Sequence, residues 1–362
     1  MLKFILTLII GSIFSITLSG QDHARRGFMV SDLEKETVNA VRYEWNANLV
    51  RLQLVPLSWA SQKNITPSEA WNWLMTKLPG WLDNAREHGI VVVIDLHHIP
   101  KSYMHLPSQE ALREFWQDPE AREMFLACWR EIAAICQHRQ EEIWFDLLNE
   151  PLNWDDMPSF PKKWPEWAQQ CIYEIRKIDT NHHIVIEPGP GGLSWGFKDF
   201  PLLNDPSDKL IYSTHQYQPH AYTMQGIQDI TGTDLAHAYL TEDLHWPGIF
   251  SDSGGGYWDK NRLETEELAA VIEFQKKHKV RIYIGEFSVV RWAPDAVQYL
   301  DDCISIFEKY GWDWSYHAFR ECHVWSLEHD DTKSSAPKAA ATPVKRAIVI
   351  KKYLNRNKFA AD

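Results

Sequence analysis

The chain has 362 residues, 44% of them hydrophobic, and a formal net charge of −12. This length is too great for one small sandwich and suits one α/β barrel, whose usual size is about 250 residues before insertions. The acidic balance argues against nucleic acid, an anionic membrane surface or a strongly acidic polysaccharide as a partner. A neutral polymer remains compatible with it.

The first twenty residues have the pattern of a secretory signal peptide. Lys3 supplies the positive start, residues 4–18 are apolar, and the small pair Ser19-Gly20 precedes Gln21. The alternative is a membrane anchor, but the apolar stretch is shorter than the ~20 residues that span a bilayer. We therefore expect residues 1–20 to be removed, residues 21–362 to form the mature domain, and the protein to be secreted or periplasmic with no membrane association.

Short apolar runs recur along the rest of the chain and predict strands. They lie at residues 26–30, 48–55, 90–96, 143–148, 183–187, 210–213, 281–285 and 312–318. Most lack a period of two, as expected when both faces of a parallel sheet are buried. Helix-start signals lie between them at Thr66-Pro67, Asp118-Pro119, Trp164-Pro165 and Thr342-Pro343. Eight strands alternating with helices predict a single-domain (β/α)₈ TIM barrel.

Two predicted loops are longer than a bare barrel needs, at about residues 218–260 and 325–342. Long loops at the C-terminal face of a barrel commonly carry function, and a surface insertion is the alternative.

The five cysteines, Cys128, Cys136, Cys171, Cys303 and Cys322, give an odd count. Cys128 and Cys136 fall on one predicted helix, about 12 Å apart. A disulfide tolerates a Cα separation of only about 7 Å, so these two are not expected to pair. No spacing indicates a zinc site, and most of these residues are expected to be small buried hydrophobes.

Two glutamates each close a predicted strand. Glu150 follows the run at 143–148, and Glu286 ends the run at 281–285. The active site of an α/β barrel lies at the carboxyl ends of its strands. Glycosidic bonds are cleaved by two carboxyl groups that face each other across the sugar. This placement makes Glu150 and Glu286 the candidate catalytic pair.

The two strand-ending glutamates and the motifs around them give the chain a resemblance to glycoside hydrolase family 5 over about residues 25–355. The motifs that carry the resemblance are Leu148-Asn149-Glu150-Pro151, Ile284-Gly285-Glu286-Phe287, Val50-Arg51-Leu52, Ile94-Asp95-Leu96-His97-His98 and His215-Gln216-Tyr217. The resemblance implies a retaining mechanism in which one carboxyl begins protonated and the other ionised, about 5–5.5 Å apart. Glu150 then matches the general acid/base and Glu286 the nucleophile.

The same resemblance implies roles for other residues. Arg51 fits the cation that keeps Glu286 ionised, and Tyr217 fits a hydrogen-bond donor to it. Asn149 matches the residue that binds the sugar 2-hydroxyl. The remaining matches are His97 and His215, as sugar-binding and orienting histidines.

Alternatives stay open for several of these residues. Adjacent side chains on a strand point to opposite sides, so only one of His97 and His98 can face the site, and His98 is the better structural candidate. Arg51 could instead form a structural ion pair inside the barrel. Glu187 also ends a strand, and could bind sugar or pair with a cation. His215 and Tyr217, two residues apart, are expected on one face.

The last strand departs from the family pattern. Members commonly carry a tryptophan there as a sugar platform, but His317 stands at the expected place. Trp325, eight residues further on, is the candidate substitute from the following loop.

We expect a secreted retaining β-glycosidase of a neutral polysaccharide or oligosaccharide, and first an endo-β-1,4-glucanase. A β-mannanase or an exo-acting β-glucosidase is the near alternative. The carboxylates account for acid–base and covalent chemistry, so no cofactor or metal is expected. Two more distant alternatives are a metal-dependent barrel hydrolase with Asp95, His97, His98 and His215 as ligands, and a non-catalytic carbohydrate-binding barrel.

Overall fold

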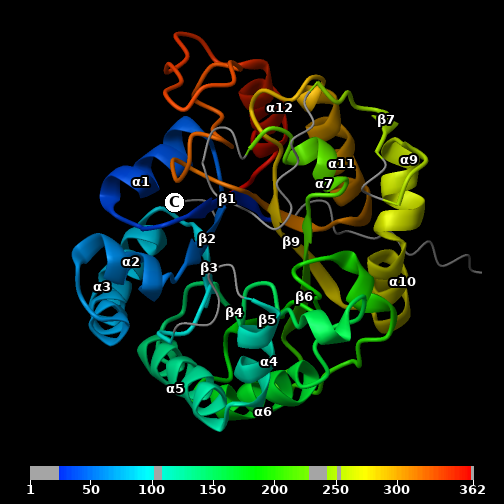
Figure 1. Cartoon of the computed structure of the whole chain (residues 1–362). Helices are drawn as coiled ribbons and strands as arrows, with labels where there is room; N and C mark the ends of the chain where they lie inside the picture. The colour runs from blue at the N-terminus through cyan, green and yellow to red at the C-terminus, as the bar shows by residue number, and fades with distance from the viewer. Residues whose placement is uncertain (1–23, 102–107, 228–242, 251–253, 360–362) are drawn as a thin grey trace, which may run out of the picture.

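A computed structural model describes residues 24–101, 108–227, 243–250 and 254–359 of the chain. Eight parallel strands close into a barrel in the order β1-β10-β9-β6-β5-β4-β3-β2 (Figure 1). Their bounds are β1 Arg26–Val30, β2 Leu49–Gln53, β3 Val91–Asp95, β4 Ile143–Asp146, β5 His183–Ile186, β6 Leu210–Gln216, β9 Arg281–Phe287 and β10 Asp313–Tyr316. All eight predicted strands are present, which confirms the (β/α)₈ barrel.

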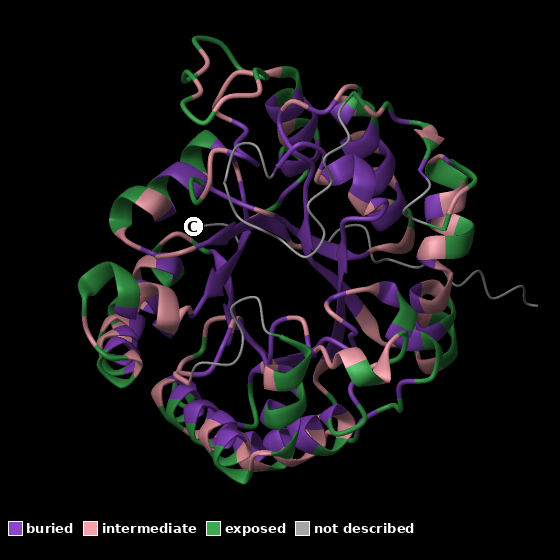
Figure 2. Ribbon diagram, in the orientation of Figure 1, coloured by how far each residue is buried: buried purple, intermediate pink, exposed green. Residues whose placement is uncertain are grey.

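The barrel strands are buried on both faces, and the helices form the outer ring (Figure 2). Large apolar side chains fill the barrel interior: Leu49, Val91, Val93, Trp144, Val185, Ile211 and Tyr283. The alternate strand residues pack outward against the helices. Because both faces are apolar, the strands appear in the sequence as continuous hydrophobic runs.

Helices follow the strands around the barrel. Their bounds are α1 Lys35–Asn39, α2 Pro56–Lys63, α3 Pro67–Glu87, α4 Gln109–Gln117, α5 Pro119–Cys136, α6 Trp164–Arg176, α7 His220–Thr223, α9 Lys260–Arg262, α10 Ala269–His278, α11 Ala296–Tyr310 and α12 Lys345–Leu354. Three helix starts agree with the sequence signals. Thr66 and Glu69 form a reciprocal capping box, Asp118 caps α5, and a proline lies in the first turn of α6. The fourth start differs, because extended backbone at Val344 delays α12 to Lys345.

Both long loops lie after strand ends. The first includes α7 and a small antiparallel hairpin of β7 (Gly248–Ile249) and β8 (Tyr257–Trp258), whose two-residue strands are too short to give a periodic signal. Residues 228–242 and 251–253 of this loop lie outside the described residues. The second loop is held by two buried arginines, which donate to its backbone carbonyls. Arg291 binds the Asp330 and Ser334 oxygens, and Arg346 binds that of Ser326.

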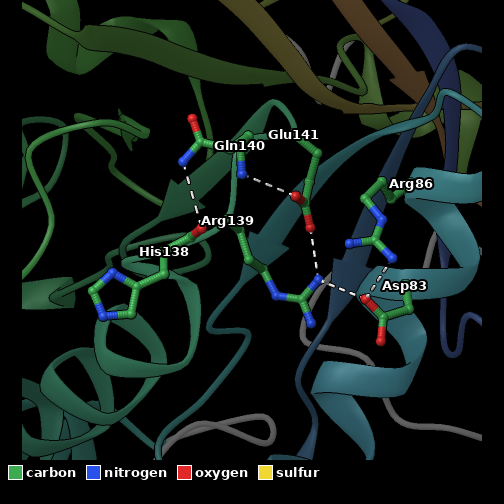
Figure 3. Close-up of a pocket in the computed structure, with 6 residues that line it drawn as sticks. All are labelled: Asp83, Arg86, His138, Arg139, Gln140 and Glu141. Carbon is green, nitrogen blue, oxygen red and sulfur yellow. Dashed lines mark hydrogen bonds and ion pairs between the residues drawn. The ribbon is translucent and has the colours of Figure 1, made fainter.

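The long loops lie at the C-terminal end of the barrel. A surface hollow lies at the other, N-terminal end, between the end of α3 and the segment before β4 (Figure 3). Arg139 pairs there with Asp83 at 3.0 Å and Glu141 at 2.7 Å, and it donates to the Pro79 carbonyl at 2.9 Å. These charges satisfy one another. Residues at this end of a barrel serve stability, so the chemistry is to be sought at the other end.

No described helix is both long and apolar enough to cross a bilayer. The expected signal peptide, residues 1–20, lies outside the described part of the chain. All five cysteines are free, and four of them are buried, which confirms that Cys128 and Cys136 do not pair.

Candidate active site

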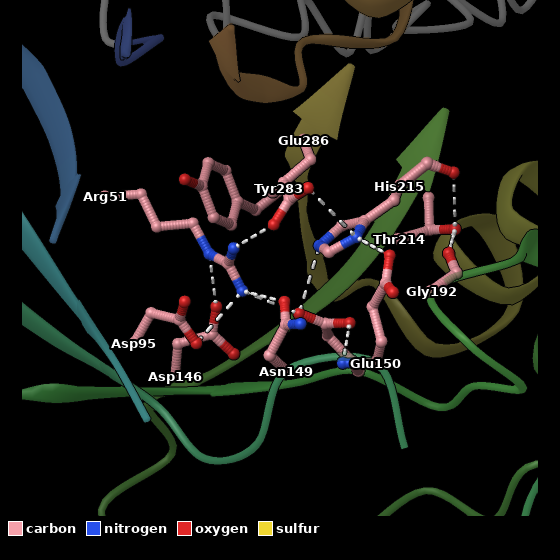
Figure 4. A network of polar contacts seen from close by, with 12 residues as sticks. Arg51, Asp95, Asp146, Asn149, Glu150, Gly192, Thr214, His215, Tyr283 and Glu286 are labelled. Atoms are coloured by element: carbon pink, nitrogen blue, oxygen red, sulfur yellow. Dashed lines mark hydrogen bonds and ion pairs between the residues drawn. The ribbon is translucent and has the colours of Figure 1, made fainter. Parts of the chain in front are cut away.

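Arg51, on β2, is the centre of a polar cluster at the C-terminal end of the barrel (Figure 4). Its side chain is completely buried. The guanidinium contacts one amide and four carboxylates: Glu286 at 2.6 Å, Asp146 at 2.9 Å, Asn149 at 3.0 Å, Glu187 at 3.0 Å and Asp95 at 3.1 Å. The planar arginine guanidinium carries five fixed N–H donors and can reach several acceptors at once, whereas a lysine ammonium is a compact point charge.

Glu286 lies on β9 with its side chain pointing toward Arg51. Its other carboxylate oxygen accepts a hydrogen bond from the Tyr217 hydroxyl at 2.9 Å. Burial on its own would raise the pKa of Glu286, but the nearby cations, above all His215, lower it far below its ordinary value. The carboxylate is therefore held ionised, as a nucleophile requires.

Glu150 lies four residues after the end of β4, with its backbone in the left-handed region at φ 47°. That conformation is uncommon for a residue with a side chain. Here it is fixed from both sides: the Glu150 N–H donates to Glu187 at 3.1 Å, and the carboxylate contacts His215 Nδ1 at 2.7 Å. The Glu150 side chain is 38% exposed, whereas that of Glu286 is 7% exposed. Glu150 is thus the more accessible carboxyl of the two.

The two candidate catalytic carboxyls lie close together. One carboxylate oxygen of Glu150, one of Glu286 and one ring nitrogen of His215 all fall within 4.8 Å of each other. This close approach agrees with the short carboxyl separation of about 5–5.5 Å in retaining glycosidases.

His215 reaches both carboxylates because of an irregularity in the sheet. On the β6–β9 pair, Thr214 lies opposite Ile284, but the next residue, His215, lies opposite Glu286, so no β6 residue lies opposite Gly285. A Cβ on Gly285 would come within 2.8 Å of His215 Nε2. The glycine before Glu286 thus makes room for the imidazole.

A second glycine closes over the other side of this ring. Gly192, at φ 73°, follows β5, and its carbonyl accepts a hydrogen bond from the backbone N–H of His215 at 2.7 Å. A Cβ there would approach His215 Nδ1 at 2.8 Å and Glu150 Oε1 at 2.9 Å. Any larger residue would separate the histidine from the carboxyl that it contacts.

The Asn149 amide connects the cluster to His97. Its oxygen accepts from Arg51, and its nitrogen lies 3.4 Å from His97 Nε2. His97 Nδ1 pairs with Asp95 at 2.8 Å. Burial would lower the pKa of His97, but the Asp95 charge and hydrogen bond raise it. The neighbouring His98 is 2% exposed, in agreement with a structural place.

Three rings gather beside Glu286. The ring centroids of Tyr217 and His317 are 6.2 Å apart, those of His317 and Trp325 are 5.7 Å apart, and those of Tyr217 and Trp325 are 6.5 Å apart. Trp325 is only 8% exposed. The structure thus brings Trp325 to the site, and its role as a sugar platform stays a prediction.

Sequence reasoning missed the acidic partners of Arg51. Asp95 and Asp146 lie opposite each other on β3 and β4, and both are fully buried. Burial is the largest cause that raises the pKa of Asp146 well above its ordinary value, against the Arg51 charge. The available signal was a carboxylate inside each otherwise apolar strand, which is uncommon unless it is paired. Glu187 is also fully buried and pairs with Arg51, so the cation-pairing alternative holds for it.

The metal-ligand set considered from the sequence is not assembled. Among the described residues, the group of possible ligands consists of Glu150, His215 and Glu286. Asp95, His97 and His98 do not belong to it.

This geometry, with paired carboxyls at the open end of a (β/α)₈ barrel, defines a candidate glycoside-cleaving site. Residues 15–322 match the family described as Cellulase (glycosyl hydrolase family 5). The chain therefore belongs to glycosyl hydrolase family 5, and it is a glycoside hydrolase.

Curated relatives agree with this assignment, and solved structures agree with the barrel fold. Endoglucanase C of Acetivibrio thermocellus is 26% identical over 259 residues, which cover 65% of this chain and 70% of that protein. Cellodextrinase A of Ruminococcus flavefaciens is 29% identical over 247 residues, with 66% and 64% covered. Crystal structures with the same fold include cellulose synthase subunit Z from Clostridioides difficile, with a TM-score of 0.67, 19% identity, and 91% and 99% covered. Another is Thermotoga maritima Cel5A with cellobiose, with a TM-score of 0.66, 22% identity, and 91% and 98% covered.

Proposed function

We propose that this protein is a retaining endo-β-1,4-glucanase that cleaves neutral β-glucan through a covalent intermediate on Glu286. The observation that carries the proposal is the close approach of the Glu150 and Glu286 carboxylates, within 4.8 Å, with Arg51 and Tyr217 bound to Glu286 and the Glu150 side chain 38% exposed. One carboxyl is thus kept ionised, and the other is accessible to a leaving group.

In the first step Glu286 attacks the anomeric carbon while Glu150 gives its proton to the glycosidic oxygen. The bond from the anomeric carbon to the leaving oxygen breaks as the bond to Glu286 forms. Arg51 and Tyr217, each within hydrogen-bond distance of Glu286, orient the attacking carboxylate. The Asn149 amide, beside Arg51 and His97, is placed to bind the 2-hydroxyl, where hydrogen bonds strengthen in the transition state.

In the second step water replaces Glu286 on the anomeric carbon. Glu150, now ionised, removes a proton from that water, and the sugar leaves with the configuration it began with. His215 contacts Glu150 at 2.7 Å and lies 3.9 Å from Glu286, so it can support whichever carboxylate carries charge.

The curated relatives are named endoglucanases and a cellodextrinase, and these names favour β-1,4-glucan as the substrate. Hydrolysis of carboxymethyl cellulose, glucomannan, mannan and aryl β-glucosides should separate an endoglucanase from a mannanase or an exo-acting β-glucosidase. We expect rapid loss of viscosity on a soluble β-1,4-glucan. Release of monosaccharide alone would favour the exo-acting alternative.

The catalytic roles are tested by leaving-group dependence. Glu150→Gln should lose far more activity on a phenyl glycoside than on a dinitrophenyl glycoside, because a good leaving group departs without protonation. Proton NMR in the first minutes should show the β-anomer. Equal losses on both glycosides, or α-anomer first, would contradict the assignment.

Secretion belongs to the same proposal. The pattern of residues 1–20 supports export followed by cleavage near Gly20. Amino-terminal sequencing of protein recovered outside the cytoplasm should begin near Gln21. Recovery of only uncleaved, membrane-bound chain would support the anchor alternative.

A further inference from the structure

Glu187 lies beneath the reacting pair and takes part in none of the steps described above. It follows β5 directly, its side chain is completely buried, and its backbone carbonyl accepts a hydrogen bond from the Trp164 indole at 2.7 Å. A sugar cannot reach a carboxylate that has no exposed surface. The sugar-binding alternative for Glu187 is thereby removed.

Both oxygens of this carboxylate are engaged by donors from other strands. Oε1 lies 3.0 Å from Arg51 Nη2 and 3.2 Å from His215 Nε2, and Oε2 accepts the backbone N–H of Glu150 at 3.1 Å. The first contact is to the cation that orients the nucleophile. The other two are to the ring and the backbone that place the acid/base.

We propose that Glu187 is a positioning residue for the acid/base, which fixes the left-handed backbone of Glu150 and the ring of His215 so that the Glu150 carboxyl faces the leaving-group oxygen. This inference rests on the proposed role of Glu150. It adds a carboxylate on β5, outside the catalytic pair, that acts through its neighbours and not on the substrate.

The ring of His215 shows why a carboxylate is needed. Nδ1 faces the Glu150 carboxylate at 2.7 Å, and Nε2 faces the Glu187 carboxylate at 3.2 Å. Because the ionised Glu187 carboxylate can only accept, it favours a proton on Nε2, which leaves Nδ1 to share the proton of the Glu150 carboxyl. Without the acceptor at Nε2, the imidazole is free to lose that proton or to rotate, and its hold on Glu150 is lost.

An amide cannot replace this carboxylate. Glutamine has nearly the same shape, but one of its two terminal atoms is a donor. If the oxygen faces the Glu150 N–H, the NH₂ group faces the donors of Arg51 and His215. If the amide is flipped, the NH₂ group faces the Glu150 N–H. Either orientation sets donor against donor in a buried site, which is costly.

The test is a leaving-group series on Glu187→Gln, with aryl β-glycosides from phenyl to 2,4-dinitrophenyl. We expect kcat/KM to fall roughly ten- to a hundredfold on the phenyl glycoside and less than about threefold on the dinitrophenyl glycoside. The matched control is Glu308→Gln. Glu308 is another largely buried glutamate. It forms an ion pair with Arg26 at 2.6 Å and does not contact the site. Its loss should lower the melting temperature without changing the leaving-group dependence.

Equal losses for Glu187→Gln along the whole series would overturn the inference, because a purely structural defect does not distinguish leaving groups. Glu150→Gln is measured beside it. If Glu150→Gln shows the leaving-group dependence and Glu187→Gln does not, only this inference fails. If Glu150→Gln shows none, the proposed function fails first.

A second measurement does not depend on the folding of the variant. Nitrogen-15 NMR of the wild-type enzyme labelled at histidine, with the His215 signal assigned by its loss in His215→Asn, should show a protonated Nε2 at pH 7. An unprotonated Nε2 would contradict the contact with Glu187.

Discussion

Replacing Arg51 with methionine tests the electrostatic arrangement of the site. Arg51 is the fully buried cation among four buried carboxylates, and each contact is between 2.6 and 3.1 Å. Removing one partner of a buried ion pair costs about 3–5 kcal/mol, because the remaining charge is left unpaired. We therefore expect Arg51→Met to lower the free energy of unfolding by about that amount at pH 7.

The matched control is Arg25→Met. Arg25 makes one ion pair with Glu142 at 2.6 Å, and both side chains are 28% exposed. A pair as exposed as this contributes about 1 kcal/mol or less. Guanidinium denaturation followed by tryptophan fluorescence would measure both variants.

The pH dependence of this loss gives a second check. Without Arg51 the carboxylates repel one another, so their pKa values rise and protonation relieves the repulsion as the pH falls. The destabilisation of Arg51→Met should thus be smaller at pH 5 than at pH 8. Equal destabilisation by the two variants, or a loss for Arg51→Met that does not change with pH, would refute the reasoning.

Further predictions concern the reaction itself. Glu286→Gly should abolish turnover, and added azide should restore activity on an activated aryl glycoside with inverted product; wild-type rates in Glu286→Ala would exclude the nucleophile role. Since the pKa of Glu286 is lowered, it stays ionised below the ordinary glutamate value of about 4.3, so the acid limb of kcat/KM should lie below that pH wherever the enzyme remains folded. An acid limb at pH 5 or above in enzyme that is still folded would show that the pKa of Glu286 is not lowered. Trp325→Ala should lower kcat/KM roughly ten- to a hundredfold in the protein that remains folded, by analogy with aromatic stacking of ~1–3 kcal/mol; a destabilised but fully active variant would remove Trp325 from the site. Activity should survive EDTA, and its loss with recovery on adding a divalent cation would favour the metal-dependent alternative.

The barrel could be predicted because its strands are buried on both faces. Runs such as residues 90–96 and 143–148 are short, apolar and separated by helices with clear start signals. Helix caps such as Asp118 are local and depend on few contacts. The β7–β8 hairpin could not be predicted, because two-residue strands form only where the surrounding loop brings them together.

The catalytic pair could be proposed from strand-end positions, but the network around it could not. Asp95 and Asp146 become partners of Arg51 only when three neighbouring strands meet in register. The contact of Glu187 with the backbone of Glu150 depends on a left-handed turn that no local pattern specifies. Similarly, the need for glycine at position 192 follows from its closeness to His215, which is distant in sequence.

Trapping the covalent intermediate tests the central claim most directly. A 2-deoxy-2-fluoro β-glycoside with a good leaving group slows hydrolysis of the glycosyl-enzyme, so the adduct can be digested and mapped by mass spectrometry. We predict one added sugar per chain, attached to Glu286, and none in Glu286→Gln. A sugar attached to another residue, or turnover of this substrate with no adduct and with inversion at the anomeric carbon, would contradict the assignment.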